Sequence, residues 1–208
     1  MHKIIIFDFD GVLADTLDDM LRYAAQVCAQ LGHPRQPTQA DLDALDHMSF
    51  DEFARQLKLP EKAVKDFTRR NFKLFASSPR PPDIFDGLGD VVVRLARRCK
   101  LGIVTGNTSE AVWNFLHRHG LAEHISIVLD AGAAGSRSDK IRQVAASLGG
   151  PGSEVYVIGD AVSDVRAARR ASARSVAVTW GHQSREKLAA ERPDHVVHSP
   201  EDLLELLD

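Results

Sequence analysis

The sequence has little of what is typical of secreted, membrane-spanning or nucleic-acid-binding proteins. Only two of its 208 residues are cysteines, Cys28 and Cys99, with neither metal-ligand spacing nor a disulfide framework. No apolar run approaches the roughly 20 residues that cross a bilayer, and acids follow the first apolar run where a secretory leader would continue. The formal net charge of −3 gives no general attraction for nucleic acid or an anionic membrane. We therefore expect a cytoplasmic protein with reduced thiols that acts without nucleic acid or a membrane as partner.

The chain instead contains six short apolar runs, most of them rich in β-branched residues. They cover residues 3–9, 100–106, 125–132, 154–160, 173–180 and 195–197. Amphipathic stretches lie between them, at 87–98, 109–120, 138–150 and 161–171. Nearly continuous apolar runs are typical of strands that are covered on both faces of a parallel sheet. Their alternation with helical stretches predicts an α/β fold with a doubly wound, mainly parallel sheet.

Residues 15–85 interrupt this alternation with a pattern that is almost wholly helical. Apolar residues recur there at helical spacing, and Pro-rich stretches at 33–37 and 77–83 mark loops. We predict a small α-helical domain at 15–85, inserted into an α/β core domain formed by 1–14 and 86–208. The second half of the insertion is basic, and its basic side chains form either a solvated surface or a contact for an anionic substrate.

Three of the apolar runs end in a residue that can take part in chemistry: Asp8, Thr105 and Asp160. The carboxyl ends of parallel strands share one edge of the sheet, where ligands bind. Asp10 follows Asp8 by two residues and Asp164 follows Asp160 by four, which gives four carboxylates in one region. Their mutual repulsion would be severe without a cation. Oxygen ligands without His or Cys select a hard ion, and a few carboxylates beside a phosphate suit Mg²⁺.

A cation near the start of a helix adds a candidate phosphate contact. If Ser138 caps the helix that follows, Lys140 lies in the first turn, where the helix dipole disfavours a cation. A lysine at that position suggests a use, such as pairing with the acids and with a phosphate oxygen. Arg137 and Arg142 are competing cations, and a lysine that only reaches to the surface is the structural alternative.

The residues after the second of these strand ends also suit a phosphate. Thr105 opens the stretch TGNTSEAV, a loop of small residues that leads into a helix. Backbone N–H groups at such a helix start, together with the Thr105 hydroxyl, form a natural seat for a phosphate.

Taken in order, these motifs resemble those of the haloacid dehalogenase (HAD) superfamily. DFDGVLADT, IVTGN, Lys140 and VIGDAVSDVRAA are similar to its four motifs in turn, and the helical insertion is similar to its small helical cap. VTWGH and the C-terminal PDHVVHSPEDLLELL look like the phosphoglycolate-phosphatase-like branch. The resemblance implies a Rossmann-like core and a Mg²⁺-dependent phosphatase for a small phosphorylated metabolite, with phosphoglycolate as one candidate.

The resemblance also implies a role for each matching residue. Asp8 would be the nucleophile that forms an aspartyl-phosphate, and Asp10 would be the general acid for the leaving alcohol and then the base for water. Mg²⁺ would be bound by the Asp8 carboxylate, the Asp10 backbone carbonyl and Asp160, with Asp164 close by or acting through water. The transferring phosphoryl group would be held by Thr105, Lys140 and backbone N–H groups around Gly11, Gly106 and Asn107.

Other functions stay open at the level of the sequence. A sugar-phosphate mutase shares this arrangement, because the cap decides whether water or a second hydroxyl accepts the phosphoryl group. A non-catalytic binding protein could keep the fold. A dehalogenase needs no acid at Asp10, and a dinucleotide-binding protein would need a GxGxxG motif, which does not follow the first strand. Nothing in the sequence predicts an oligomeric state.

Several further polar residues receive no chemical role from the sequence. His182 lies in a loop that could border the pocket, but a surface position is the expectation. The insertion holds candidates for substrate contact among which the sequence does not choose: Arg22, Tyr23, Arg55 and Arg69.

Overall fold

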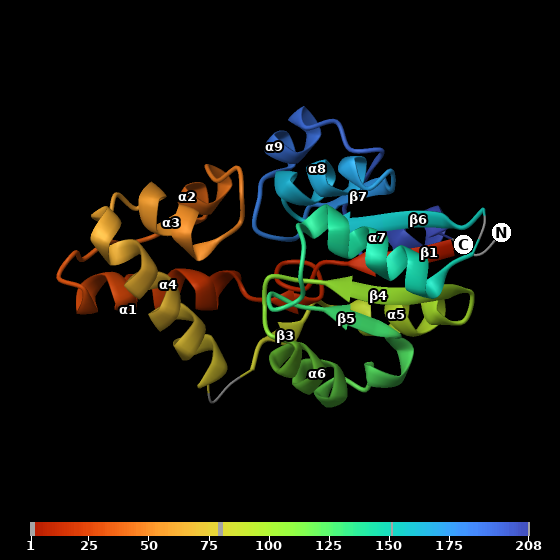
Figure 1. The fold of residues 1–208 in the computed structure, drawn as a ribbon, viewed down its shortest axis with the longest axis horizontal. Helices are drawn as coiled ribbons and strands as arrows, with labels where there is room; N and C mark the ends of the chain where they lie inside the picture. The colour runs from red at the N-terminus through yellow and green to blue at the C-terminus, as the bar shows by residue number, and fades with distance from the viewer. Residues whose placement is uncertain (1–2, 79–80, 151, 208) are drawn as a thin grey trace.

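Six strands form one parallel sheet in the order β5-β4-β1-β6-β7-β8 (Figure 1). The computed structural model describes residues 3–78, 81–150 and 152–207. The strands are β1 (Lys3–Phe7), β4 (Cys99–Val104), β5 (Ile127–Leu129), β6 (Glu154–Gly159), β7 (Arg174–Val178) and β8 (His195–Val197). Ile5 of β1 lies between Leu101 of β4 and Tyr156 of β6. Each predicted apolar run overlaps one of these strands, and the predicted doubly wound α/β fold is confirmed.

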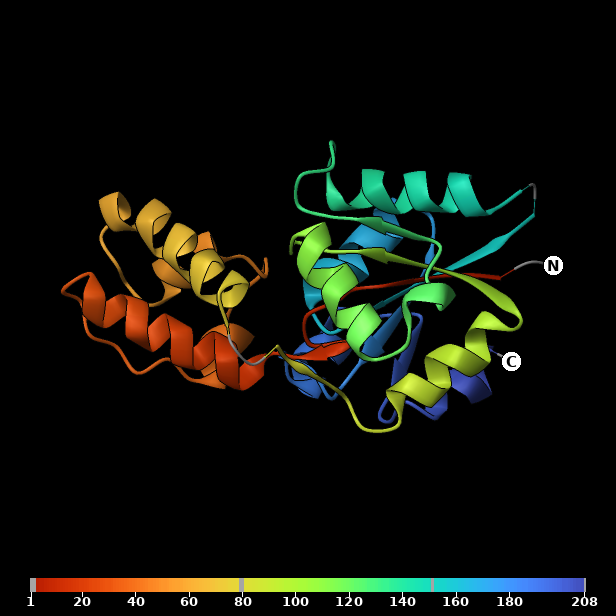
Figure 2. The same ribbon diagram turned by 90° about the horizontal axis from the view of Figure 1, so that it is seen from below.

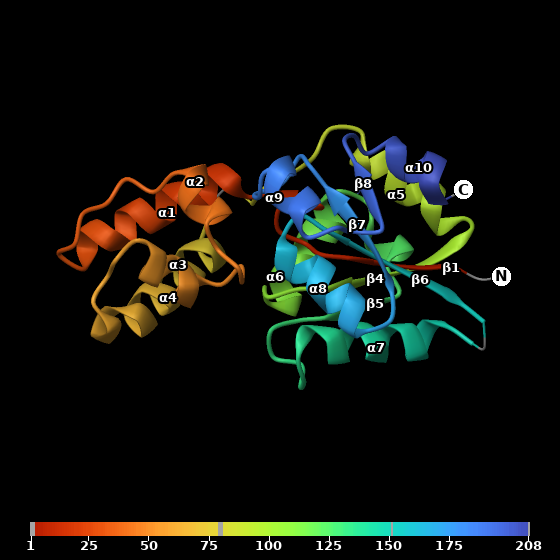
Figure 3. The ribbon, with the colours of Figure 1, turned by 90° about the horizontal axis from the view of Figure 1, so that it is seen from above.

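Helices cover both faces of this sheet. They are α5 (Leu88–Ala96), α6 (Ser109–Arg118), α7 (Arg137–Leu148), α8 (Val162–Arg170), α9 (Arg185–Ala190), α10 (Asp202–Leu207) and the 3₁₀ helix η1 (Ala122–His124). Figure 3 shows α5 and α10 on one side of the sheet and α7 on the other, and Figure 2 shows the same layers from below. The helices of these two layers leave the carboxyl edge of the strands facing the segment of residues 17–76 (Figure 1).

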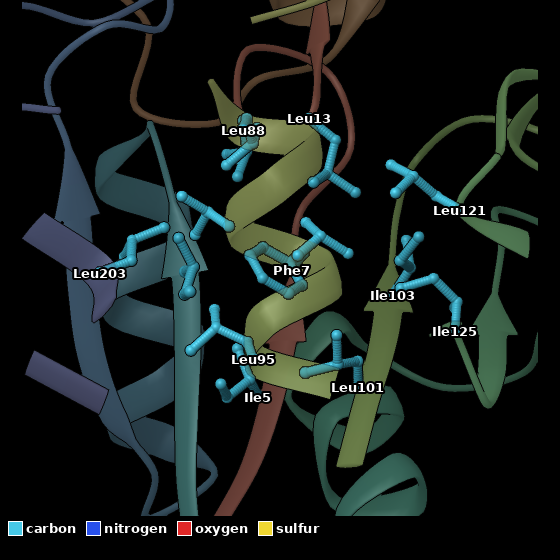
Figure 4. Packing of buried hydrophobic residues seen from close by; sticks show 14 of the residues in the cluster. Ile5, Phe7, Leu13, Leu88, Leu95, Leu101, Ile103, Leu121, Ile125 and Leu203 are labelled. Atoms are coloured by element: carbon cyan, nitrogen blue, oxygen red, sulfur yellow. The ribbon is translucent and has the colours of Figure 1, made fainter. Parts of the chain in front are cut away.

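The central strand supplies side chains to both faces, because successive residues of a strand point in opposite directions. Ile5 and Phe7 join a core with α5, α6 and α10 (Figure 4), whereas Ile4 and Ile6 pack with α7 and α8. All four are fully buried, and full burial of a large apolar side chain contributes about 1.5–3 kcal/mol. This burial fixes β1 in the sheet and with it the position of Asp8, which follows.

The helix after β5 is capped two residues earlier than expected. Ser136, not Ser138, is the N-cap of α7, and its hydroxyl accepts from the N–H of Asp139 at 3.3 Å. The Asp139 carboxylate accepts in return from the N–H of Ser136 at 2.9 Å. This reciprocal pair satisfies two donors at the helix start and makes Arg137 the first residue of α7.

The first four helices of the described chain form a bundle to one side of the sheet, called here the helical bundle (Figure 1). They are α1 (Leu17–Gln30), α2 (Gln39–Asp43), α3 (Phe50–Gln56) and α4 (Glu61–Ala76). Their buried apolar residues, among them Val27, Phe53 and Phe67, form a cluster of their own. The short strands β2 (Ala14–Asp15) and β3 (Asp83–Ile84) pair antiparallel where the chain enters and leaves the bundle. Within the described residues, every helix is too short or too polar to cross a membrane.

Candidate active site

The residues that follow β1, β4 and β6 meet at the carboxyl edge of the sheet. Asp8 continues β1 by one residue, and its N–H donates to the carbonyl of Ile158 in β6 at 2.8 Å. Thr105 directly follows β4, and Asp160 directly follows β6. Because β1 lies between the other two strands, the three side chains start from neighbouring positions.

Three carboxylates form a cluster at this edge. One oxygen from each of Asp8, Asp160 and Asp164 lies within 4.8 Å of the others. Arg137, the first residue of α7, extends into the cluster, and its guanidinium nitrogens lie 2.8 Å from Asp8 Oδ1 and 2.8 Å from Asp164 Oδ1. One guanidinium does not balance three carboxylates, so the cluster attracts further positive charge.

Burial and the guanidinium act in opposite directions on this cluster. Burial raises the pKa of the Asp8 carboxyl, and Arg137 opposes that rise. Burial also raises the pKa of Asp164, again against Arg137. Burial disfavours the charge of Arg137 as well, but Asp164 and Asp8 outweigh this effect and hold the pKa of Arg137 above its usual value. Removing the Arg137 guanidinium would leave the buried carboxylates without their cation, which is strongly unfavourable.

Asp10 lies beside the cluster and has a different environment. Its carboxylate accepts from the side-chain amide of Asn107 at 3.3 Å. Burial, followed by the negative charge of Asp8, raises the pKa of Asp10 to about 6. A carboxyl group with a pKa near neutrality can both give and take a proton.

Two glycines allow the backbone to approach Asp160 closely. Gly11 has a φ of +76°, and a Cβ at this position would lie 2.1 Å from Asp160 Oδ2. At Gly181, a Cβ would lie 2.3 Å from Asp160 Cβ. A side chain at either position would therefore displace the Asp160 carboxylate.

A cavity of about 290 Å³ lies between the sheet edge and the helical bundle. Its sheet side includes Asp8, Asp10, Asn107, Arg137 and Asp160. Its opposite side is formed by side chains of the helical bundle. A substrate in this cavity would therefore contact the carboxylates with one end and the bundle with the other.

Comparison with known proteins identifies the family. The sequence matches the haloacid dehalogenase-like hydrolases over residues 5–178. The chain belongs to this family. It is 30% identical to a phosphoglycolate phosphatase from Synechococcus elongatus over 204 residues, covering 98% of this chain and 96% of the relative. A phosphoglycolate phosphatase from Vibrio parahaemolyticus is 25% identical over 224 residues, covering 99% of this chain and 96% of the relative.

The fold of this chain is also similar to that of solved structures. A haloacid dehalogenase-like hydrolase from Streptococcus pneumoniae superimposes with a TM-score of 0.85 at 19% identity, covering 100% of this chain and 99% of the other. The predicted family is thereby confirmed, and the match of the two folds extends through the helical bundle.

In this haloacid dehalogenase-like hydrolase, the carboxylate cluster fits a metal ion. The three side chains offer only carboxylate oxygens, the donors that hard divalent cations prefer. Asp164 Oδ1 is buried and accepts no hydrogen bond, although the Arg137 guanidinium lies beside it. A buried polar atom without a hydrogen bond needs an explanation, and a metal ion held by the cluster would supply one.

His182 is part of the site, so the expected surface position was wrong. Its side chain is buried, its Nδ1 lies 2.9 Å from Asp160 Oδ2, and its backbone N–H donates to the same oxygen at 2.7 Å. Burial lowers the pKa of His182, but the Asp160 carboxylate outweighs burial and raises the pKa overall. His182 lies in the loop after β7, which ends at the same sheet edge, so the strand-end rule could have found it.

Two of the predicted phosphate contacts have other partners. The ammonium of Lys140 donates to the carbonyl of Asp130 at 2.6 Å. The hydroxyl of Thr105 accepts from the N–H of Asn107 at 2.9 Å. In the described part of the chain, neither residue lines the cavity, whereas Arg137 does. The expected contact between Lys140 and the acids is therefore made by Arg137, because the earlier cap at Ser136 brings Arg137 to the helix start.

The four bundle residues considered from the sequence do not line the cavity within the described residues. Tyr23 is buried and donates its hydroxyl to Ser78 at 2.9 Å. The three arginines pair with acids of the bundle: Arg22 with Asp19, Arg55 with Glu52 and Glu61, and Arg69 with Asp66.

Proposed function

We propose that this chain is a Mg²⁺-dependent phosphatase that hydrolyses a small phosphomonoester through an aspartyl-phosphate on Asp8. The observation that carries the proposal is Asp10, whose pKa is raised to about 6 beside Asp8 and which lines the cavity. An alcohol leaving group needs a proton, which Asp10 can supply, whereas a halide leaves without one. The similarity to phosphatases over nearly the whole chain confirms the predicted enzyme class.

The proposed reaction has two displacements at phosphorus. In the first, a carboxylate oxygen of Asp8 forms a bond to phosphorus while the bond to the alcohol oxygen breaks, and Asp10 gives that oxygen a proton. In the second, water attacks the same phosphorus, Asp10 takes a proton from the water, and the bond to Asp8 breaks. One positioned carboxyl thus serves as acid and then as base.

Asp8, Asp160 and Asp164 would hold Mg²⁺, together with the backbone carbonyl of Asp10. When bound, the ion supplies positive charge that offsets the repulsion between the carboxylates and the phosphate. The chain orients two of these ligands by itself. Asp164 accepts from the N–H of Ala161 at 3.1 Å, and Asp160 accepts from the N–H of His182 at 2.7 Å.

We assign the cation that faces the phosphoryl group to Arg137, with Lys140 as the alternative. The contact of Arg137 with Asp8 and its place in the cavity wall support this assignment. Lys140 would then act at a distance, by holding the loop at Asp130. The sequence also predicts contacts to the other phosphate oxygens from Thr105, Asn107 and backbone N–H groups around Gly11 and Gly106. Of these, Asn107 and Gly106 line the cavity.

We also propose that residues 15–85 act as a cap domain over a core domain formed by 1–14 and 86–208. The position of the helical bundle opposite Asp8 and Asp10 supports this role. A cytoplasmic location is proposed from the sequence, which has no disulfide framework.

The test is release of inorganic phosphate by the purified chain with Mg²⁺. p-Nitrophenyl phosphate serves as a general substrate, and the names of the relatives make phosphoglycolate the first metabolite to assay. We expect turnover that stops when EDTA removes the metal. Absence of phosphate release from every phosphomonoester tested, with the metal bound, would contradict the proposal and favour a mutase or a binding protein.

A further inference from the structure

The helical bundle presents an apolar wall to the cavity. It contributes eight apolar side chains, among them Met20, Leu42, Phe50 and Phe72. This wall lies opposite Asp8 and Asp10, so it is the part of the cavity that would receive the alcohol side of a phosphomonoester.

The polar side chains in this wall are engaged within the bundle. Ser49 is the N-cap of α3, where its hydroxyl accepts from the N–H of Glu52 at 3.2 Å. The hydroxyl of Thr68 donates to the Asp51 carboxylate. These hydrogen bonds stabilise the bundle. The apolar side chains therefore determine which alcohol groups of a substrate can bind to the wall.

Among the described residues, the bundle contributes no cation to this cavity, and its one charged lining residue is Asp51. Its basic residues lie elsewhere: Arg69, Arg70 and Lys73 border a second hollow together with Gln30 and Leu74. A carboxylate of the alcohol that reached this wall would exchange water for apolar side chains and would face Asp51 instead of a cation of the bundle. Both effects disfavour its binding.

Phe72 is the single large apolar side chain among the described residues that is exposed, with 39% of its surface accessible, and it lines this cavity. Its ring meets that of Phe50 edge-on, with centroids 5.1 Å apart, and Phe50 lies 5.9 Å from Phe75. Covering exposed apolar surface is favourable, and aromatic rings accept further rings in offset or edge-on contacts.

From these observations we propose that the helical bundle selects a phosphomonoester whose alcohol is an uncharged aromatic or hydrocarbon group, and rejects an alcohol that carries a carboxylate. This inference rests on the proposed phosphatase function. Phosphoglycolate is then a poor substrate of this chain, because its alcohol, glycolate, carries a carboxylate group.

A matched pair of substrates tests the charge preference. Benzyl phosphate and 4-carboxybenzyl phosphate differ only at a position remote from the phosphate, and kcat/KM is measured for both, and for phosphoglycolate, by phosphate release with Mg²⁺. We expect benzyl phosphate to exceed each carboxylated substrate by at least about tenfold. Equal or reversed preference would overturn the inference and leave the phosphatase proposal standing, as would release from p-nitrophenyl phosphate alone. No release from any of the three or from p-nitrophenyl phosphate would overturn both.

Variants locate the preference in the bundle wall. Phe72→Ala should lower kcat/KM for benzyl phosphate by about five- to tenfold, mainly through KM, and should lower kcat/KM for phosphoglycolate by a clearly smaller factor. Leu74→Ala is the matched control on the same helix, because Leu74 packs against the bundle core and lines the second hollow. Asp51→Asn should raise kcat/KM for 4-carboxybenzyl phosphate and not for benzyl phosphate. An equal loss on all substrates in Phe72→Ala, or no loss on benzyl phosphate, would overturn the assignment.

Discussion

The two sides of the cavity differ in chemistry and in what holds them. On the sheet side, strand ends and a helix start position Asp8, Asp160 and Arg137, and the wall is dominated by ionisable groups. On the bundle side, the wall is mainly apolar, with Phe72 exposed. The first side suits the phosphoryl group that all phosphomonoesters share, and the second suits the alcohol that differs among them. Reaction and selection should therefore be separable by mutation.

The largest effect should come from the proposed nucleophile. Asp8→Asn should lower kcat by at least about 10⁴-fold for every substrate, because an amide cannot form the acyl phosphate. The fold should persist, since the amide oxygen can still accept from the N–H of Phe9 as Asp8 does at 2.7 Å. Phosphate release and the thermal midpoint measure the two outcomes, and retained turnover would remove Asp8 as the nucleophile.

The proposed proton carrier comes next. Asp10→Asn should slow turnover by about 10³-fold, because both displacements lose their acid or base. The loss should be as large for benzyl phosphate as for phosphoglycolate, which sets it apart from the substrate-dependent loss in Phe72→Ala. Normal steady-state rates in this variant would exclude Asp10 from the mechanism.

A paired comparison decides between the two cations. Arg137→Ala should lower kcat/KM by about 10²-fold for all substrates, since it removes the positive charge beside Asp8. Lys140→Met keeps the buried stem and removes only the contact to the Asp130 carbonyl, so its loss should be smaller. A larger loss in Lys140→Met than in Arg137→Ala would return the role to the lysine.

The pH profile gives the smallest effect. The pKa of Asp10 is raised to about 6, so the protonated form that starts the reaction declines about tenfold per pH unit above that value. We expect kcat/KM to fall as pH rises through about 6, and we expect this limb to be missing in Asp10→Asn. If kcat/KM falls over the same pH range in the unmodified chain and in Asp10→Asn, a group other than Asp10 causes the fall.

Much of the sheet side could be predicted from the sequence, because strand ends are local signals. Asp8 and Asp160 follow short apolar runs that are typical of buried strands, and a parallel sheet brings such ends together. The choice between Arg137 and Lys140 depended on which serine caps α7, and Ser136 and Ser138 are both good caps. A shift of two residues there changes which side chain reaches the acids.

The bundle side could not be predicted in the same way. Phe72 reads as one more apolar residue of an amphipathic helix, like Phe67, which is fully buried. Whether such a side chain faces the bundle core or the cavity depends on how α4 packs against α1 and α3, and the periodicity of one helix does not contain that information. The basic residues of the same helix also did not predict an apolar cavity wall.

Trapping the covalent intermediate tests the central claim most directly. The chain is mixed rapidly with Mg²⁺ and benzyl phosphate, quenched in acid and treated with sodium borohydride, which reduces an acyl phosphate to an alcohol. Peptide mass spectrometry should then find homoserine at position 8 and unmodified aspartate at positions 10, 160 and 164. Turnover without homoserine at position 8, or with the modification at another aspartate, would contradict the mechanism.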